Sequence, residues 1–117
     1  MPAREEAYIT RPDQYRLVYA SGSVWRSGLV VLQALPNGLP YSRCGFSVSK
    51  RVGKAVVRNR VKRRLREIAR QMPLKAGWDM VFVARPAAAE ADYTSLRRAV
   101  KGLLVRARLL ETACLAV

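Results

Sequence analysis

The segment from residue 55 to residue 72 combines a narrow apolar stripe with a dense array of cations. Its apolar residues recur three or four positions apart, which is the spacing of one face of an α-helix, and Pro73 ends the pattern. Because the other faces of this helix are polar, only the stripe can be buried, and we predict that it packs on a sheet. The stripe consists of Val57, Val61, Leu65, Ile68 and Met72.

The cations of this region exceed what folding alone explains. Residues 43–70 hold eleven Lys or Arg and one acid, Glu67, and so carry +10 of the net charge of +14. An ordinary solvated face is the simplest interpretation of a charge run, but solvated helices usually mix both signs, and like charges one turn apart repel. Charge alone does not distinguish a nucleic-acid partner from an anionic membrane. The loop before the helix is also basic, and the free N–H groups of a first helical turn attract phosphates, so we infer a nucleic acid.

The remainder of the chain alternates between helix and strand patterns. Thr10 is a suitable N-cap for a first helix, with Asp13 in the capping-box position and Gly22 as a natural stop. The order is a helix, two or three strands, a helix, a strand and a helix, so we predict a single α+β domain over residues 1–117, an α/β sandwich written α-β-β-β-α-β-α, with helices packed on the sheet. The expected helices are residues 10–22, 55–72 and 93–110, and the expected strand segments are residues 24–35, 43–49 and 78–85.

Two features outside the basic helix are candidates for contact with a ligand. The strand over residues 43–49 alternates, with Phe46 on an apolar face and Ser47 on a small, polar face that either admits a large ligand or is simply solvated. Tyr15 and Tyr19 lie on one face of the first helix, where they are either core residues or ligand-facing aromatics. We expect disorder in residues 1–9 and 112–117 and assign them no function.

The side chains that catalysis or metal binding would require are scarce. The chain has no histidine, and its eight acids show neither a paired nor a metal-binding spacing. Cys44 and Cys114 lack the CxxC spacing of a zinc or redox site, which indicates a reduced, cytoplasmic protein. The sequence has no signal-peptide pattern and no apolar run of membrane-spanning length. We therefore expect a nucleic-acid-binding protein with no catalytic side chains, no metal or cofactor bound by the protein alone, no membrane partner and no small-molecule substrate.

Residues 45–66 carry a specific resemblance. This stretch, with Arg58-Asn59-Arg60 at its centre, closely resembles the signature of the bacterial ribonuclease P protein subunit. The turn at residues 35–38, the strand end at residues 84–86 and the two spaced tyrosines of the first helix also fit. The resemblance spans most of the chain, from about Arg11 to Arg108.

The resemblance implies an assisting protein in a ribonucleoprotein endonuclease. In that family the catalytic RNA removes the 5′ leader from precursor tRNA, and the protein binds the leader and promotes binding of substrate and Mg²⁺. The Mg²⁺ of the holoenzyme is then held mainly by RNA. The partners are the catalytic RNA of ribonuclease P and precursor tRNA with its leader. The family's fold also contains an unusual left-handed strand–helix–strand crossover.

The resemblance also implies two sets of site residues. Gln33 stands where some relatives are expected to place an aromatic residue, and it can hydrogen-bond a base instead of stacking on one; the Phe46 ring belongs either to the core or to the cleft. The implied leader-binding cleft contains Tyr15, Tyr19, Gln33, Phe46, Ser47 and Ser49. The set that faces the catalytic RNA contains Lys50, Arg51, Lys54, Arg58, Asn59, Arg60, Lys62, Arg63, Arg66 and Arg70.

Two other classes of protein compete with this interpretation. A ribosomal or other structural RNA-binding protein can use the same basic helix as a clamp, and composition does not distinguish it. A DNA-binding regulator can insert such a helix into the major groove, but a reading helix normally follows another helix through a tight turn, whereas here a strand precedes it.

Overall fold

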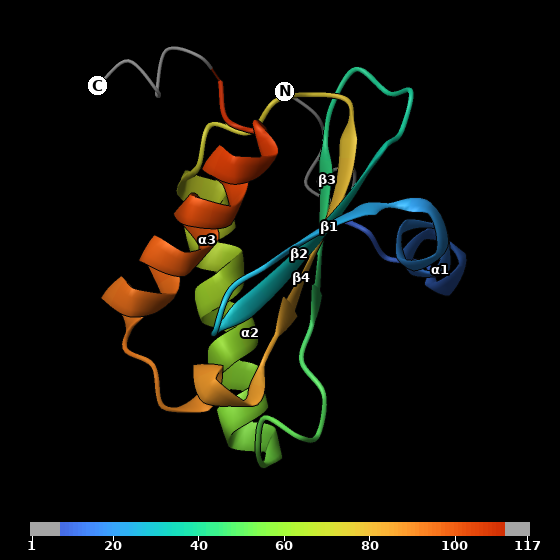
Figure 1. The fold of residues 1–117 in the computed structure, drawn as a ribbon. Coiled ribbons are helices and arrows are strands. Elements are labelled where there is room, and N and C mark those ends of the chain that lie inside the picture. The colour runs from blue at the N-terminus through green and yellow to red at the C-terminus, as the bar shows by residue number, and fades with distance from the viewer. Residues whose placement is uncertain (1–7, 112–117) are drawn as a thin grey trace.

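The computed structural model describes residues 8–111, which form a four-stranded sheet with helices on both faces (Figure 1). The predicted element order is confirmed, and a short 3-10 helix, η2, precedes the last helix. The elements are α1 (Pro12–Ser21), β1 (Ser23–Arg26), β2 (Val30–Pro36), β3 (Arg43–Ser47), α2 (Ala55–Gln71), β4 (Trp78–Ala84), η2 (Pro86–Ala89) and α3 (Tyr93–Ala107).

The N-terminal segment differs from the expectation of disorder over residues 1–9. Ile9 is 4% exposed and packs in a small cluster with Val18 and Val81. Its N–H donates to the carbonyl of Cys44 at 2.8 Å, and Tyr8 forms a parallel bridge with the same residue. These two residues were wrongly included in the disordered terminus, whereas residues 1–7 and 112–117 lie outside the described residues.

Two predicted boundaries are also corrected. The run of residues 24–35 is not one strand but the hairpin of β1 and β2, because Ser27 accepts a hydrogen bond from the Val30 N–H at 3.1 Å and turns the chain. The first helix begins at Pro12, with Arg11 as its N-cap in place of Thr10. The side chain of Gln14 accepts hydrogen bonds from the N–H groups of Thr10 and Arg11 at 3.2 and 3.1 Å, which the capping-box prediction had not included.

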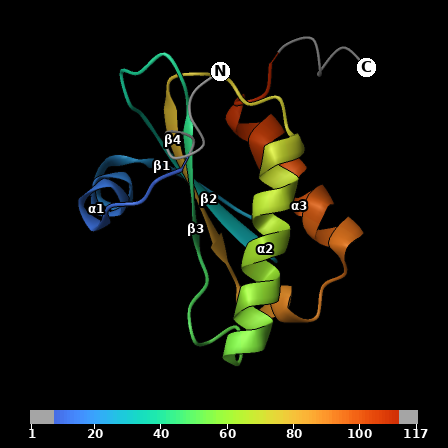
Figure 2. The same cartoon turned by 180° about the vertical axis from the view of Figure 1, so that it is seen from behind.

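The strands lie in the order β1-β2-β4-β3, and β3 runs parallel to β4. Parallel neighbours need a crossover connection, which α2 supplies, and such crossovers are right-handed in nearly all proteins. Here the path from β3 through α2 to β4 turns in the left-handed sense (Figures 1 and 2), as the resemblance implied. Helices α2 and α3 cover one face of the sheet, and α1 lies on the other.

The main core lies between the sheet and the two long helices. The apolar stripe of α2 is confirmed: Val61, Leu65 and Ile68 are at most 1% exposed, and Met72 is also buried. Val57 is half-buried and packs against the same core. The largest fully buried side chains opposite and beside the stripe are Leu32, Met80, Phe82, Leu96, Leu103, Leu104, Leu109 and Leu110.

One cation of the basic segment belongs to the fold. The guanidinium of Arg43 donates to both carboxylate oxygens of Asp79, at 2.8 and 2.6 Å, and Asp79 is 5% exposed. Asn37 donates to the same carboxylate at 2.9 Å. This group ties the start of β3 to the start of β4, so Arg43 is unavailable to a partner.

Helix α1 is seated on a glycine. The ring of Tyr15 lies directly over Gly45 in β3, and the Phe46 N–H donates to the Tyr15 hydroxyl at 3.3 Å. A Cβ at position 45 would lie 2.7 Å from Cε1 of Tyr15 and 2.8 Å from its hydroxyl. The absence of a side chain at Gly45 therefore sets how closely α1 approaches the sheet.

We predict that Gly45→Ala lowers the free energy of unfolding by about 1–3 kcal/mol, because the added methyl group displaces Tyr15. Urea denaturation of the purified variant measures this. Gly102→Ala is the control, since nothing lies within 4 Å of its added Cβ, and removing a glycine from a helix should raise stability by about 0.5–1 kcal/mol. Equal changes in the free energy of unfolding for the two substitutions would contradict the close packing of Tyr15 on Gly45.

Candidate nucleic-acid interface

The exposed cations of α2 and its leading loop form one surface, which we call the α2 surface. Because the apolar stripe is buried, the opposite side of the helix faces solvent, as the helical spacing predicted. Within residues 8–111 these side chains stay exposed, although the Arg66 guanidinium also lies over the Tyr8 ring. The α2 surface consists of Lys50, Arg51, Lys54, Asn59, Lys62, Arg63, Arg66 and Arg70, all of which are exposed.

The arginines on the flanks of α2 are placed differently. Arg58 and Arg60 are half-buried, and a guanidinium nitrogen of Arg60 donates to the carbonyl of Ala89 at 3.0 Å. Arg64 makes the equivalent contact with the carbonyl of Ala91 at 3.2 Å. Arg60 and Arg64 hold the end of η2 and the residues after it against α2, so part of the arginine run has a structural function that the sequence analysis missed.

The one acid of α2 does little to neutralise the helix. Arg70 and Gln71 both donate hydrogen bonds to the Glu67 carboxylate. The hydrogen bond from Arg70 lowers the pKa of Glu67 below its ordinary value, so the carboxylate stays charged and paired. The remaining exposed cations of the α2 surface keep their net positive charge for an external polyanion.

The side of the sheet on which α1 lies, which we call the α1 face, carries most of the other predicted set. In register across the strands, Gln33 is level with Val81 and Gly45, and Val31 is level with Val83 and Ser47. Gln33, Val31, Val83 and Ser47 are half-buried, so α1 leaves part of this face open. The side-chain oxygen of Gln33 is buried and finds no hydrogen-bond partner among residues 8–111.

The two tyrosines of α1 have separate positions beside this face. Tyr15 is half-buried and packs against the Ile9, Val18 and Val81 cluster, and burial raises the pKa of its hydroxyl. Tyr19 is 43% exposed, and its ring centre lies 6.3 Å from that of Tyr15. Tyr15 is therefore largely a core residue, while Tyr19 offers a free aromatic face.

Two members of the predicted leader-binding set lie elsewhere. The Phe46 ring is 6% exposed and stacks on Phe82 at 5.8 Å, on the face that α2 covers, so it is a core residue. Ser49 follows the end of β3 in the basic loop, where its hydroxyl accepts a hydrogen bond from the Arg51 N–H at 3.3 Å. The α1 face thus brings together Tyr15, Tyr19, Gln33 and Ser47, but not these two.

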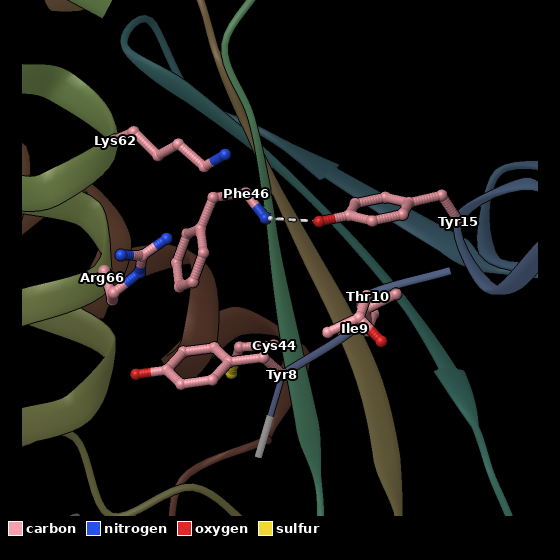
Figure 3. A pocket seen from close by; sticks show the side chains of 8 residues that line it. All are labelled: Tyr8, Ile9, Thr10, Tyr15, Cys44, Phe46, Lys62 and Arg66. Atoms are coloured by element: carbon pink, nitrogen blue, oxygen red, sulfur yellow. Dashed lines mark hydrogen bonds between the residues drawn. The ribbon is translucent and has the colours of Figure 1, made fainter. Parts of the chain in front are cut away.

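A cavity of about 350 Å³ lies at the edge of β3, between the two surfaces (Figure 3). Tyr8, which sequence analysis did not single out, forms one wall, and the guanidinium of Arg66 lies over its ring at 5.6 Å. Cys44 also lines the cavity, where burial raises the pKa of its thiol to about 12 and keeps it protonated. The lining residues are Tyr8, Ile9, Thr10, Tyr15, Cys44, Phe46, Lys62 and Arg66.

Within the part of the chain that the structure describes, acidic and sulfur side chains do not converge. Residues 8–111 contain no group of three or more His, Cys, Asp or Glu side chains that could hold a metal ion. No helix among them is long and apolar enough to cross a membrane.

Comparison with known proteins gives a consistent family. The model of the family described as Ribonuclease P matches residues 3–108. A ribonuclease P protein component from Dehalococcoides mccartyi is 50% identical over 105 residues, covering 90% of this chain and 88% of that protein. Another, from Roseiflexus castenholzii, is 47% identical over 113 residues, covering 93% of both proteins.

Solved structures are similar over nearly the whole fold. A mutant of the Staphylococcus aureus RNase P protein has a TM-score of 0.84 at 25% identity, covering 91% of this chain and 92% of that one. The RNase P protein from Thermotoga maritima has a TM-score of 0.78 at 28% identity, covering 85% of this chain and 96% of that one.

We predict that Arg60→Gln lowers the free energy of unfolding by about 1–2 kcal/mol, because the Ala89 carbonyl loses a charged donor. Arg63→Gln, which removes an exposed cation from the same helix, should change stability by less than about 0.5 kcal/mol. Urea denaturation of both variants distinguishes a structural arginine from a free one. Equal stability of the two variants would contradict the structural assignment of Arg60.

Proposed function

The chain belongs to the ribonuclease P protein family, and from that premise we propose that it binds the catalytic RNA of ribonuclease P through the α2 surface. We further propose that the α1 face takes the 5′ leader of precursor tRNA. In this function the protein assists endonucleolytic removal of the leader in the cytoplasm, and the RNA performs the chemistry.

The proposal rests on one observation: the exposed cations of the α2 surface and the exposed aromatic residue of the α1 face lie on opposite sides of β3. The α2 surface offers exposed cations and little else, which suits the phosphates of a folded RNA. The α1 face offers the exposed ring of Tyr19 and the half-buried side chains of Val31, Gln33 and Ser47. Unpaired bases stack on such rings, whereas paired bases are already stacked on each other.

The assignment of catalysis to RNA is supported by what the protein offers chemically. Hydrolysis by two metal ions uses clustered carboxylates, and residues 8–111 bring no such cluster together. The proposed contribution of the protein is electrostatic. Its cations reduce repulsion between the phosphates of the two RNAs, so that substrate and the Mg²⁺ held by RNA bind more readily.

The leader contacts follow from the chemistry of each side chain. The Tyr19 ring stacks on a base, the Gln33 amide hydrogen-bonds a base edge once its side chain turns outward, and the Ser47 hydroxyl bonds the backbone or a base edge. Because the hydrogen bonds of a glutamine amide are directional, we expect a base preference at the leader position that contacts Gln33.

The first test is cleavage of a precursor tRNA by the catalytic RNA at low Mg²⁺, with and without the protein. We predict stimulation, and a smaller stimulation with Lys54→Ala/Arg63→Ala together with a higher Mg²⁺ requirement. The slope of log affinity against log salt should fall by about one for each phosphate that the variant no longer neutralises.

Arg98→Ala/Lys101→Ala is the matched control, because it removes the same charge from exposed positions on α3. We expect this control to keep the stimulation of the unchanged protein. Absence of stimulation by the unchanged protein would refute the proposed function, and equal losses in both double variants would refute the α2 surface.

The leader contact is tested by measuring the affinity of the holoenzyme for precursor tRNA and for the same tRNA without its leader. We predict that Tyr19→Ala weakens binding by about 1–3 kcal/mol only when the leader is present, since the variant cannot stack on a leader base. Leu17→Ala is the control, because Leu17 is 57% exposed on the opposite side of α1. A similar loss for the leaderless tRNA would count against the leader contact.

A further inference from the structure

The two proposed RNA surfaces are separated by one strand. β3 is an edge strand of the sheet, with α1 on one face and α2 on the other. An RNA chain that passes from the α1 face to the α2 surface by the shortest path crosses this edge. The cavity at the edge of β3 lies on that path, because its lining includes Tyr15 from α1 and Lys62 and Arg66 from α2.

The lining of the cavity combines the two chemistries that a nucleotide presents. On the α2 side of β3, the rings of Tyr8 and Phe46 lie 6.4 Å apart, and the side chains of Lys62 and Arg66 extend toward them (Figure 3). Aromatic faces bind the flat apolar surface of a base, and cations bind its phosphate. Tyr15 reaches the cavity from the other side of the strand.

The walls of this cavity are held in place before any ligand binds. The bridge of Tyr8 to Cys44 and the Ile9 N–H bond to the Cys44 carbonyl fix the N-terminal segment along β3. Arg66 lies over the Tyr8 ring, and Phe46 stacks on the fully buried Phe82. A preorganised wall loses little conformational entropy on binding, which favours a specific contact over a loose one.

We propose that this cavity seats one unpaired RNA nucleotide, with its base against Tyr8 and its phosphate on Lys62 and Arg66. The inference rests on the proposed function and adds to it a site, a nucleotide and the residue Tyr8. An unpaired nucleotide can come from the leader of precursor tRNA or from a loop of the catalytic RNA, and the experiment separates these sources.

The experiment compares Tyr8→Ala with Tyr8→Phe, which keeps the ring, and with Tyr93→Ala, the same change at the start of α3. For each variant one measures the Kd for catalytic RNA, and the Kd of the holoenzyme for tRNA with and without a leader. Thermal denaturation of each variant reports on folding. Tyr8→Ala should weaken one of these complexes roughly 5- to 150-fold, the loss expected for one stacked base, while Tyr8→Phe and Tyr93→Ala should stay near the unchanged protein.

The source follows from which complex weakens. A loss confined to leader-bearing tRNA assigns the nucleotide to the leader, and a loss in binding of catalytic RNA assigns it to that RNA; both support the site. Unchanged affinities in Tyr8→Ala, while Tyr19→Ala still weakens leader binding, overturn the site and leave the proposed function intact. Both the site and the proposed function are overturned if the unchanged protein does not stimulate the catalytic RNA and the holoenzyme binds the two tRNAs with equal affinity.

A second measurement on the unchanged protein does not depend on the stability of Tyr8→Ala. 4-Thiouridine is placed at successive positions of the leader and of the unpaired loops of the catalytic RNA, and the cross-linked peptide is identified after irradiation of the holoenzyme. We expect one position to cross-link to the peptide that contains Tyr8. Cross-links to the peptide of Tyr19 without any to that of Tyr8 overturn the site.

Discussion

The docking of α2 through a narrow stripe is the contact on which the rest of the structure depends. Burying an aliphatic side chain such as Leu65 or Ile68 contributes about 1.5–3 kcal/mol, whereas a like-charge pair one turn apart on an exposed helix costs about 0.2–0.5 kcal/mol. A few buried residues therefore outweigh the repulsion among many arginines. Helix α2 is also the crossover between β3 and β4, and its docked orientation directs its cations away from the core.

The parts of the fold that local periodicity determines could be predicted from the sequence. The stripe of α2 is visible because one helical face must be apolar for the helix to dock. The alternation around Phe46 and Ser47 placed one side chain toward the core and the other on the α1 face, as the structure has them. The exposed cations of α2 follow from the same geometry, so the α2 surface was largely predictable.

Features that depend on distant partners could not be predicted in this way. Tyr8 and Ile9 are ordered because they pair with β3, and no local pattern announces a bridge to Cys44. In the sequence, Arg60 is one more cation of a basic run. In the structure, its guanidinium donates a hydrogen bond to the Ala89 carbonyl, 29 residues away. In each case a tertiary contact decides what an otherwise ambiguous residue does.

The edge of β3 connects the two chemically different surfaces, the α1 face and the α2 surface, that we propose bind RNA. An exposed edge normally invites pairing with another strand, but here the N-terminal segment covers part of it and the Tyr15 hydroxyl accepts from the Phe46 N–H. The backbone hydrogen-bonding groups of this edge thus bond to a side chain and to a short bridge, not to a full strand. A full strand would separate α1 from α2, whereas this sparse cover leaves the cavity open between them.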